Sequence, residues 1–135
     1  MYLLDSDICI HLMRGNLPMA YELMRKSDPR MFGIPAVVEG ELRTGARKSQ
    51  HPRENKLLLE RFLAPFECVA YDHACSVVYG DLRAALESQG CIIGPNDLLI
   101  AATAIANQAT LITGNVREFK RVPGLSLESW AEGCL

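Results

Sequence analysis

Four oxygen-bearing side chains have the types and positions that suit a hard cation. They are Asp5, Glu41, Asp97 and Asn115, and each stands at the end of a predicted element or on a helix that leans toward one sheet edge. Carboxylate and amide oxygens are the ligands that Mg²⁺ and Mn²⁺ prefer. A bound ion would keep crowded carboxylates ionised, polarise a phosphodiester and lower the pKa of an attacking water. The four residues therefore predict a hydrolytic nuclease site.

Each of these residues also has a plainer structural interpretation when it is taken alone. Asp97 could cap its helix, and Asp5 and Asp7 could be turn and capping residues after the first strand. Glu41 could be a solvated helix residue, and Asn115 a turn residue. No single position decides between these interpretations, so the prediction depends on the elements that bring the residues together.

Short apolar runs alternate with helical patterns along the chain. We expect strands over residues 2–4, 31–35, 66–70, 110–113 and 125–127. We expect helices from Ser6 or Asp7 to Arg14, and over residues 18–26, 36–47, 51–63, 72–90 and 94–107. Because no repeat, low-complexity tract or linker interrupts this alternation, it predicts a single α/β domain over residues 1–135 with a mostly parallel sheet.

The predicted topology points to a site before any motif is considered. Ligands of parallel α/β sheets bind at the carboxyl ends of the strands. That rule selects Asp5, Ser6 and Asp7 after the first strand, and Gly114 and Asn115 after the strand over residues 110–113. Both strand ends therefore carry polar, oxygen-bearing residues.

The charge of the chain limits how it could bind nucleic acid. The formal net charge is −2, which is not the bulk basicity of a protein that coats nucleic acid. RNA binding would need a local basic patch beside the acidic centre. Two clusters are candidates, Arg43, Arg47, Lys48 and Arg53 in one and Arg117, Lys120 and Arg121 in the other. The alternative is that both are solvated helix faces.

The remaining composition favours a reduced, cytoplasmic protein. No apolar run approaches the roughly 18 residues that a membrane span needs, and the opening MYLLDSD does not resemble a signal peptide. The cysteines are odd in number and form no CxxC pair, so we expect free thiols. Cys68, His73 and Cys75 could be drawn as zinc ligands, but no fourth ligand stands at a familiar spacing.

Four segments, in order, resemble the VapC branch of the PIN-domain ribonucleases across nearly the full length. They are MYLLDSDICIHLMRG at residues 1–15, ELRTGA at 41–46, GPNDLLIAA at 94–102 and TLITGNVREF at 110–119, and VPGL at 122–125 also fits. Each motif alone is weak, but four in order at suitable separations make a strong match. The resemblance implies a three-layer α/β/α domain with a short central sheet flanked by helices.

The resemblance also implies roles for individual residues. Asp5, Glu41 and Asp97 would be the core acids around Mg²⁺ or Mn²⁺, and Thr113 would support the site through its hydroxyl. Many family members have an aspartate where this chain has Asn115, so the fourth catalytic position here brings no charge. Asp7 stands where asparagine is common in the family. We expect it to cap the following helix and to support the metal-binding residues by contacts with them, without binding the metal itself.

For function, the resemblance implies the toxin of a toxin–antitoxin pair. The reaction would be endonucleolytic cleavage of a structured RNA, either tRNA or a ribosomal RNA loop. Arg43, Arg47 and Lys48 are then candidates for phosphate contacts beside the acids. Such toxins dimerise and are silenced by a VapB-like antitoxin that covers the active-site groove. The apolar helices after Pro18 and Pro52 could provide partner surfaces.

Two other functions remain open at this point. Asp5-Ser6-Asp7 matches the Asp-x-Asp of a haloacid-dehalogenase-like phosphatase, in which one aspartate is the nucleophile. Cys9 and the missing acidic pair after residues 110–113 depart from that pattern, and the chain is short for that fold. A PIN-like domain that binds RNA or protein without cutting is the non-enzymatic alternative. Dinucleotide, Walker A and GxSxG motifs are absent from the sequence.

Overall fold

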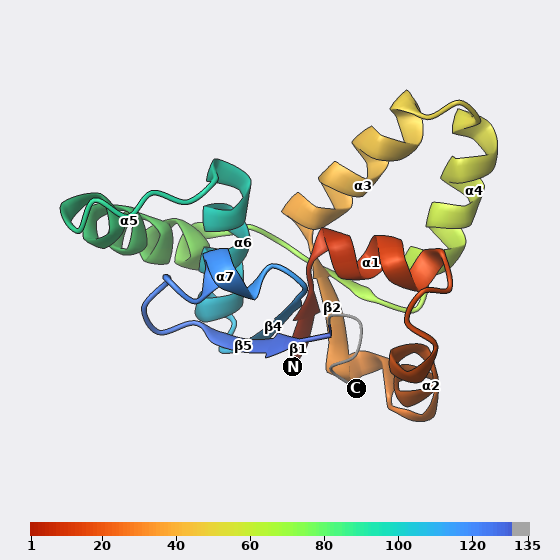
Figure 1. The fold of residues 1–135 in the computed structure, drawn as a ribbon, viewed down its shortest axis with the longest axis horizontal. Coiled ribbons are helices and arrows are strands. Elements are labelled where there is room, and N and C mark those ends of the chain that lie inside the picture. The colour runs from red at the N-terminus through yellow and green to blue at the C-terminus, as the bar shows by residue number, and fades with distance from the viewer. Residues whose placement is uncertain (131–135) are drawn as a thin grey trace.

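The computed structural model describes residues 1–130, and its centre is a five-stranded sheet (Figure 1). The strands are β1 (Tyr2–Leu4), β2 (Phe32–Pro35), β3 (Glu67–Val69), β4 (Thr110–Thr113) and β5 (Ser126–Ser129). They lie in the order β3-β2-β1-β4-β5, and every neighbouring pair is parallel. The parallel sheet predicted from the sequence is confirmed.

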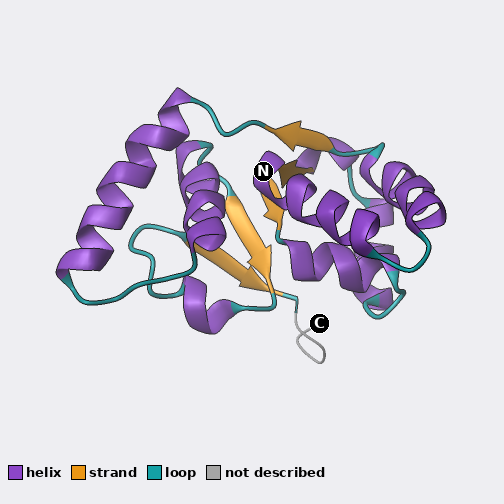
Figure 2. Cartoon of the chain, turned by 90° about the horizontal axis from the view of Figure 1, so that it is seen from above, coloured by secondary structure: helices purple, strands orange, loops and turns teal. Residues whose placement is uncertain are grey.

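The helices cover the sheet from both sides. They are α1 (Ser6–Met13), α2 (Pro18–Lys26), the 3₁₀ helix η1 (Pro29–Met31), α3 (Ala36–Lys48), α4 (Pro52–Leu63), α5 (His73–Ser88), α6 (Pro95–Ala106) and α7 (Val116–Phe119). From β1 to β3 the chain moves one way across the sheet, and from β3 to β5 it moves back. Because such crossovers are right-handed, the two directions place their helices on opposite faces. Figures 1 and 2 show α1 to α4 on one side and α5 to α7 on the other, which confirms the three-layer α/β/α fold.

The helix ends follow the local sequence, with two differences from expectation. The N-cap of α1 is Asp5, not Ser6 or Asp7, because the carboxylate of Asp5 accepts the backbone N–H of Ser6. The short helix α7 was not predicted, since a single turn has no periodicity to detect. The end of α5 is as expected, because Gly90 adopts a φ of +67° just after it.

The arrangement of β1 and β4 fixes where a site can form. These strands are neighbours in the sheet, but the chain leaves β1 toward β2 and leaves β4 toward β5. The connections therefore separate at this point and leave a crevice at the carboxyl ends of the two strands, where α/β proteins bind ligands. Leu3, Leu4 and Ile112 are fully buried and hold the strands in the core. No helix among residues 1–130 has the length and apolarity that crossing a membrane requires.

Candidate functional site

Asp5 lies at the carboxyl end of β1, beside the end of β4. The parallel register pairs Leu4 with Ile112, so the next residues along each strand come together. The Thr113 hydroxyl donates to Oδ2 of Asp5 at 2.7 Å, and the Ser6 N–H donates to Oδ1 at 2.8 Å. Burial raises the pKa of Asp5 to about 6, although the hydrogen bond from Thr113 opposes the shift. Both sequence predictions for Asp5 therefore hold geometrically: it caps α1 and it enters the acidic centre.

Asp7 connects the first turn of α1 to the turn that follows β4. Its Oδ1 accepts the Ile8 N–H at 2.8 Å, and its Oδ2 accepts the Gly114 N–H at 3.0 Å. The fit is tight, since a Cβ on Gly114 would lie 2.6 Å from Oδ2 of Asp7. Asp7 is therefore not the N-cap of α1. It supports the site by fixing the turn after β4 through its hydrogen bond with Gly114.

Glu41 projects from α3 toward the same centre. Its Oε2 accepts the side-chain amide of Asn96 at 3.4 Å. Its Oε1 is buried and has no hydrogen-bond partner. A buried carboxylate oxygen without a partner is costly, because desolvation is not compensated. This unpartnered oxygen is the feature of the site that most directly suggests that a cation binds there.

Asp97 and Glu118 form a close pair of carboxyl groups. The cap of α6 is the backbone of Gly94, so Asp97 in the first turn is not a capping residue. Burial raises the pKa of Asp97 to about 7, helped by the proton that it shares with Glu118 and by the charges of Glu118, Asp5 and Glu41. Glu118 takes the opposite shift, because the Gly94 N–H donates to its Oε1 at 2.8 Å and lowers its pKa. The pKa values of the two carboxyl groups are therefore shifted in opposite directions.

Asn115 acts on the site through Glu118. Its side-chain amide donates to Oε2 of Glu118 at 3.0 Å, and its backbone N–H donates to Oγ1 of Thr113 at 2.9 Å. The fourth acid of the cluster is therefore Glu118, which the sequence interpretation did not select. The available signal was spacing: Glu118 stands three residues after Asn115, the N-cap residue of α7, which is the separation of a capping box. Asn96 was also missed, and an asparagine in a first turn gives no sequence signal of its own.

The assembled residues suit Mg²⁺ or Mn²⁺. Asp5, Glu41, Asp97 and Glu118 supply hard oxygen ligands, and the unpartnered Oε1 of Glu41 fits a cation. Burial is the main cause of the raised pKa of Asp5 and Asp97, and the charges of the neighbouring acids add to the shift. Within residues 1–130, no three His, Cys, Asp or Glu side chains are placed so that they could hold a metal ion as they stand. The acids thus interact through their charges, and binding an ion would need side-chain movement to close the ligand shell.

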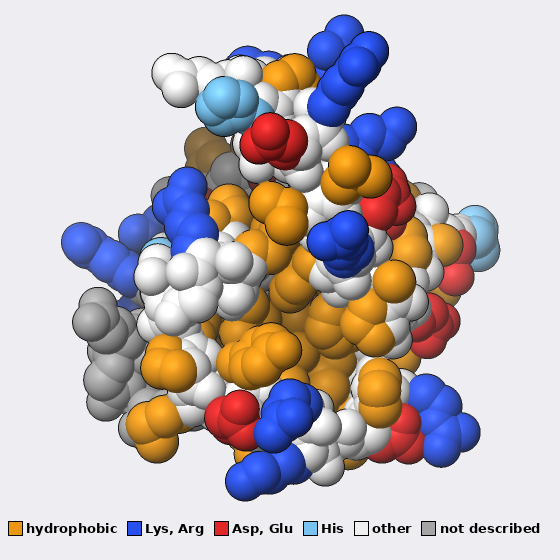
Figure 3. All heavy atoms as spheres, turned by 90° about the vertical axis from the view of Figure 1, so that its right-hand side faces the viewer, with side chains coloured by type: hydrophobic (Ala, Val, Ile, Leu, Met, Phe, Trp, Pro, Cys, Tyr) orange, Lys and Arg blue, Asp and Glu red, His pale blue; other side chains and the backbone are white. Residues whose placement is uncertain are grey.

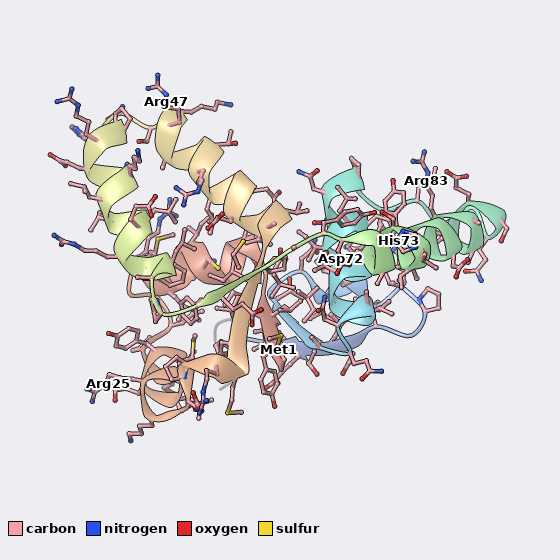
Figure 4. All side chains as sticks on the ribbon, turned by 180° about the vertical axis from the view of Figure 1, so that it is seen from behind. Met1, Arg25, Arg47, Asp72, His73 and Arg83 are labelled. Carbon is pink, nitrogen blue, oxygen red and sulfur yellow. The ribbon has the colours of Figure 1, made fainter. Side chains whose placement is uncertain are left out.

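The basic residues predicted to contact phosphates are not equivalent in the structure. Arg43 forms ion pairs with Glu60 of α4 at 2.6 Å and with Glu39 of α3 at 3.6 Å. Its positive charge is therefore neutralised by these two carboxylates at the contact between α3 and α4. Arg47 and Lys48 are exposed at the far end of α3, away from the sheet (Figure 4). The structure therefore does not bring any of the three into the acidic centre.

The zinc interpretation has no support from the geometry. Cys68 is exposed and lies 3.8 Å from Glu39, whereas Cys75 is buried and donates to the carbonyl of Ala70. His73 is exposed at the start of α5 (Figure 4). The four cysteines among residues 1–130 are free thiols, as expected, and Cys134 lies outside the described residues.

Comparison with known proteins agrees with the motifs. The model of the PIN domain matches residues 2–125. Ribonuclease VapC2 of Rickettsia felis is 42% identical over 132 residues, which is 96% of this chain and 97% of that protein. The tRNA(fMet)-specific endonuclease VapC of Shigella flexneri is 35% identical over 130 residues, which is 96% of this chain and 98% of that protein.

Solved structures show the same architecture. VapBC2 from Rickettsia felis, bound to a DNA fragment from its promoter, has a chain that aligns with a TM-score of 0.88 at 41% identity, covering 96% of this chain and 98% of that chain. DNA-bound VapBC from Salmonella typhimurium aligns with a TM-score of 0.91 at 32% identity, covering 96% and 97%. Fold, motif order and identity over nearly the full length agree, and this chain therefore belongs to the PIN-domain family, within its VapC branch.

Proposed function

We propose that this chain is a divalent-metal-dependent endoribonuclease that cuts a structured RNA and acts as the toxin of a VapBC-type pair. The observation that carries the proposal is the meeting of Asp5, Glu41, Asp97 and Glu118 at the strand ends, with one buried oxygen of Glu41 unpartnered. Such a set of acids is costly for folding unless it binds a cation. In the proposed enzyme, the bound cation compensates this cost and takes part in the reaction.

Different neighbouring residues hold the individual acids in position by hydrogen bonds. Mg²⁺ or Mn²⁺, when bound, supplies a Lewis acid for the phosphodiester and a lowered pKa for the attacking water. Thr113 fixes Oδ2 of Asp5, and Asn115 and Gly94 fix the two oxygens of Glu118. The raised pKa of Asp97 beside Glu118 implies that binding of a cation should favour loss of a proton from this pair.

The RNA class follows from relatives and from shape together. A relative at 35% identity is named for tRNA(fMet), and its match covers 96% of this chain. We therefore take tRNA as the first candidate substrate and a ribosomal RNA loop as the second. The acids lie at the ends of β1 and β4 and on the helices beside them, and a single-stranded loop of a folded RNA can present its backbone to such a site more readily than a continuous duplex.

The test compares cleavage by the wild type and two variants. Purified protein is incubated with labelled total tRNA, and separately with ribosomal RNA, in Mg²⁺, in Mn²⁺ and in EDTA. We expect discrete products with metal, none with EDTA, and loss of cutting in Asp97→Asn. Asp81→Asn, which changes an exposed acid on α5, is the matched control and should cut normally. Equal cutting by wild type and Asp97→Asn would place the reaction elsewhere.

The proposed antitoxin partner has a candidate binding surface whose lining contains none of the four acids, so it is separate from the active-site groove that the family resemblance implied. An apolar groove of about 380 Å³ lies between α2, η1 and α4, and Figure 3 shows the hollow with its hydrophobic lining. Its lining includes Leu12, Tyr21, Met24, Phe62 and Phe66, with Arg25 and Arg61 also part of it. An amphipathic segment carrying an acidic residue is the ligand chemistry that this surface fits.

The chains that align with this one at TM-scores of 0.88 and 0.91 come from VapBC complexes, so we assign the groove to a VapB-like antitoxin. The helices that form it follow Pro18 and Pro52, as the sequence had suggested. The product of the adjoining reading frame is the partner to test by co-purification. Tyr21→Glu should prevent binding, whereas Met19→Glu, exposed on the same helix but outside the lining, should not. Retention of the partner by both variants would contradict this assignment.

The other functions have less support. A phosphatase that uses Asp5 and Asp7 needs one of them free to react, but both oxygens of Asp7 accept backbone N–H groups. A purely binding PIN-like domain would not need four acids with an unpartnered oxygen among them. Dimerisation and cytoplasmic location stay predictions of the family resemblance.

A further inference from the structure

The turn between α3 and α4 carries a group of positive side chains that the acidic centre does not use. We call Arg47, Lys48 and Arg53 the basic tip. All three are exposed, and among residues 1–130 none has an ion-pair partner within 4.0 Å. Only one acid, Glu54, lies in the same stretch of chain. Figure 3 shows Lys and Arg side chains gathered at the top of the molecule, where this turn lies in Figure 1.

The basic tip is held in place by the two helices that it joins. The Asn55 amide donates to the Ser49 hydroxyl at 2.8 Å, and that hydroxyl donates to the carbonyl of Ala46 at 2.6 Å. Arg43 further connects the helices through its ion pair with Glu60. The positive charges therefore have a fixed position relative to the acids, unlike those of an unstructured loop.

Helix α3 sets the distance between the tip and the acidic centre. Glu41 in the centre and Lys48 in the tip stand on the same helix, seven residues apart, which corresponds to about 10 Å at a rise of about 1.5 Å per residue. Stacked nucleotides advance about 3.4 Å along a strand. Along α3, Lys48 of the tip therefore lies about 10 Å from Glu41, a length that corresponds to about three nucleotides of a stacked strand.

We propose that the basic tip binds backbone phosphates of the RNA substrate about three nucleotides from the cleavage site. This inference rests on the proposed ribonuclease function and adds the element that attracts the substrate. Four carboxylates repel a polyanion, and the net charge of −2 provides no general attraction. Exposed guanidinium groups without carboxylate partners are suited to phosphate oxygens, which they bind with two parallel hydrogen bonds. We do not include Arg43 among the phosphate-binding residues, because it forms ion pairs with Glu60 and Glu39.

The experiment measures RNA affinity as a function of salt. The protein carries Asp97→Asn so that the RNA stays intact, and the probe is a fluorescent tRNA transcript read by anisotropy. The tip variant is Arg47→Ala, Lys48→Ala and Arg53→Ala together. The control removes three exposed positive charges elsewhere that also have no ion-pair partner among residues 1–130, by Arg14→Ala, Lys26→Ala and Arg61→Ala. Figure 4 shows how far apart these regions lie, since Arg25, next to Lys26, is at the opposite end from Arg47.

Each phosphate contact contributes about 0.7 to 0.9 to the slope of log affinity against log salt. We therefore expect the tip variant to lose about 2 to 3 from that slope, and the control to keep it. In the cleavage-competent chain the tip variant should raise KM and leave kcat unchanged. An unaltered slope in the tip variant, or an equal loss in the control, overturns the proposal.

The other results are also informative. If the tip variant keeps its RNA affinity but no longer binds the antitoxin, the tip is a protein-binding surface and the proposal is wrong. Wild-type protein that cuts tRNA while the tip variant binds normally rejects only this inference. Wild-type protein that neither binds nor cuts any RNA rejects the proposed function as well. Unchanged thermal unfolding of both triple variants would establish that the comparison concerns binding and not folding.

Discussion

The Thr113 hydroxyl donates to Oδ2 of Asp5 at 2.7 Å, although 108 residues separate them in the chain. Both side chains are buried, and each stands at the carboxyl end of its strand. The bond lowers the pKa of Asp5 against the larger effect of burial. It therefore helps to keep Asp5 ionised, which a metal ligand requires.

Replacing Thr113 by valine should weaken metal binding. Thr113→Val keeps the shape of the side chain but removes the donor to Asp5 and the acceptor for the Asn115 N–H. Loss of such a supporting contact typically costs about 10- to 100-fold in metal affinity or activity. The measurement is the Mg²⁺ concentration that gives half-maximal cleavage. Thr113→Ser keeps the hydroxyl and should behave like the wild type, so similar defects in both variants would exclude the hydrogen bond as the cause.

The raised pKa values of Asp5 and Asp97 predict that the metal-free protein becomes less stable as pH rises. Their folded-state pKa values are about 6 and about 7, above the ordinary aspartate value of 3.8. Below pH 4 both states are protonated and the full stability is present. Between about pH 4 and 7 the unfolded chain releases protons that the folded chain retains, so the free energy of unfolding falls. For Asp5 the loss is on the order of 3 kcal/mol.

Comparison with Asp5→Asn isolates this effect from groups such as Asp72, whose lowered pKa acts in the opposite direction. Without metal, the variant should be increasingly more stable than the wild type from pH 4 to pH 8, as measured by denaturant unfolding. Mg²⁺ or Mn²⁺ should stabilise the wild type at pH 8 much more than the variant. A difference between the two proteins that does not change with pH would contradict the raised pKa.

The sequence predicted most of the scaffold because its signals are local. Strands such as residues 2–4 are short apolar runs, and α2, α4 and α6 begin at prolines that suit a first helical turn. The carboxyl-end rule placed Asp5 and Asn115 at one edge without any motif. What these signals share is that each depends on residues close together in the chain.

The part that could not be predicted depends on contacts between distant segments. Glu118 enters the site because its carboxylate reaches Gly94 of another helix, a contact that its own surroundings in the sequence do not indicate. Arg43 forms an ion pair with Glu60 because α3 and α4 pack against each other. Its guanidinium group is therefore already paired with a carboxylate in the absence of substrate. The cap of α1 moved by one residue for a similar reason, since Asp5 is fixed from β4 by Thr113.

Glu118 should be as necessary for cleavage as the three acids found from the sequence. Glu118→Gln keeps the size of the side chain but removes the charge that lies beside Asp97. We expect at least about a 100-fold loss of kcat, in the range seen when one charged group of an active site is removed. The pKa of Asp97, followed by NMR in the metal-free protein, should fall toward its ordinary value. Glu87→Gln, in an exposed ion pair with Arg83, is the control and should leave both quantities unchanged. Full activity of Glu118→Gln would make Glu118 a purely structural residue.

A methyl group at position 114 should disturb the turn after β4. In Gly114→Ala the new Cβ would lie 2.6 Å from Oδ2 of Asp7, so Asp7 must move and lose the hydrogen bond from the backbone N–H of residue 114. The cost should be about 1 kcal/mol in stability, the net value of one such bond. Cleavage should fall further than stability, because the same turn places Asn115 against Glu118.

The control for backbone entropy is Gly40→Ala in α3, where a Cβ meets nothing within 4 Å. This change should stabilise the protein by up to about 1 kcal/mol. Asp7→Ala removes the same hydrogen bond from the other side, so the double variant with Gly114→Ala should lose little more stability than either single variant. Denaturant unfolding of the four proteins in this cycle gives the coupling free energy directly. Additive losses would mean that Asp7 and Gly114 act independently, and that the turn is positioned by some other contact.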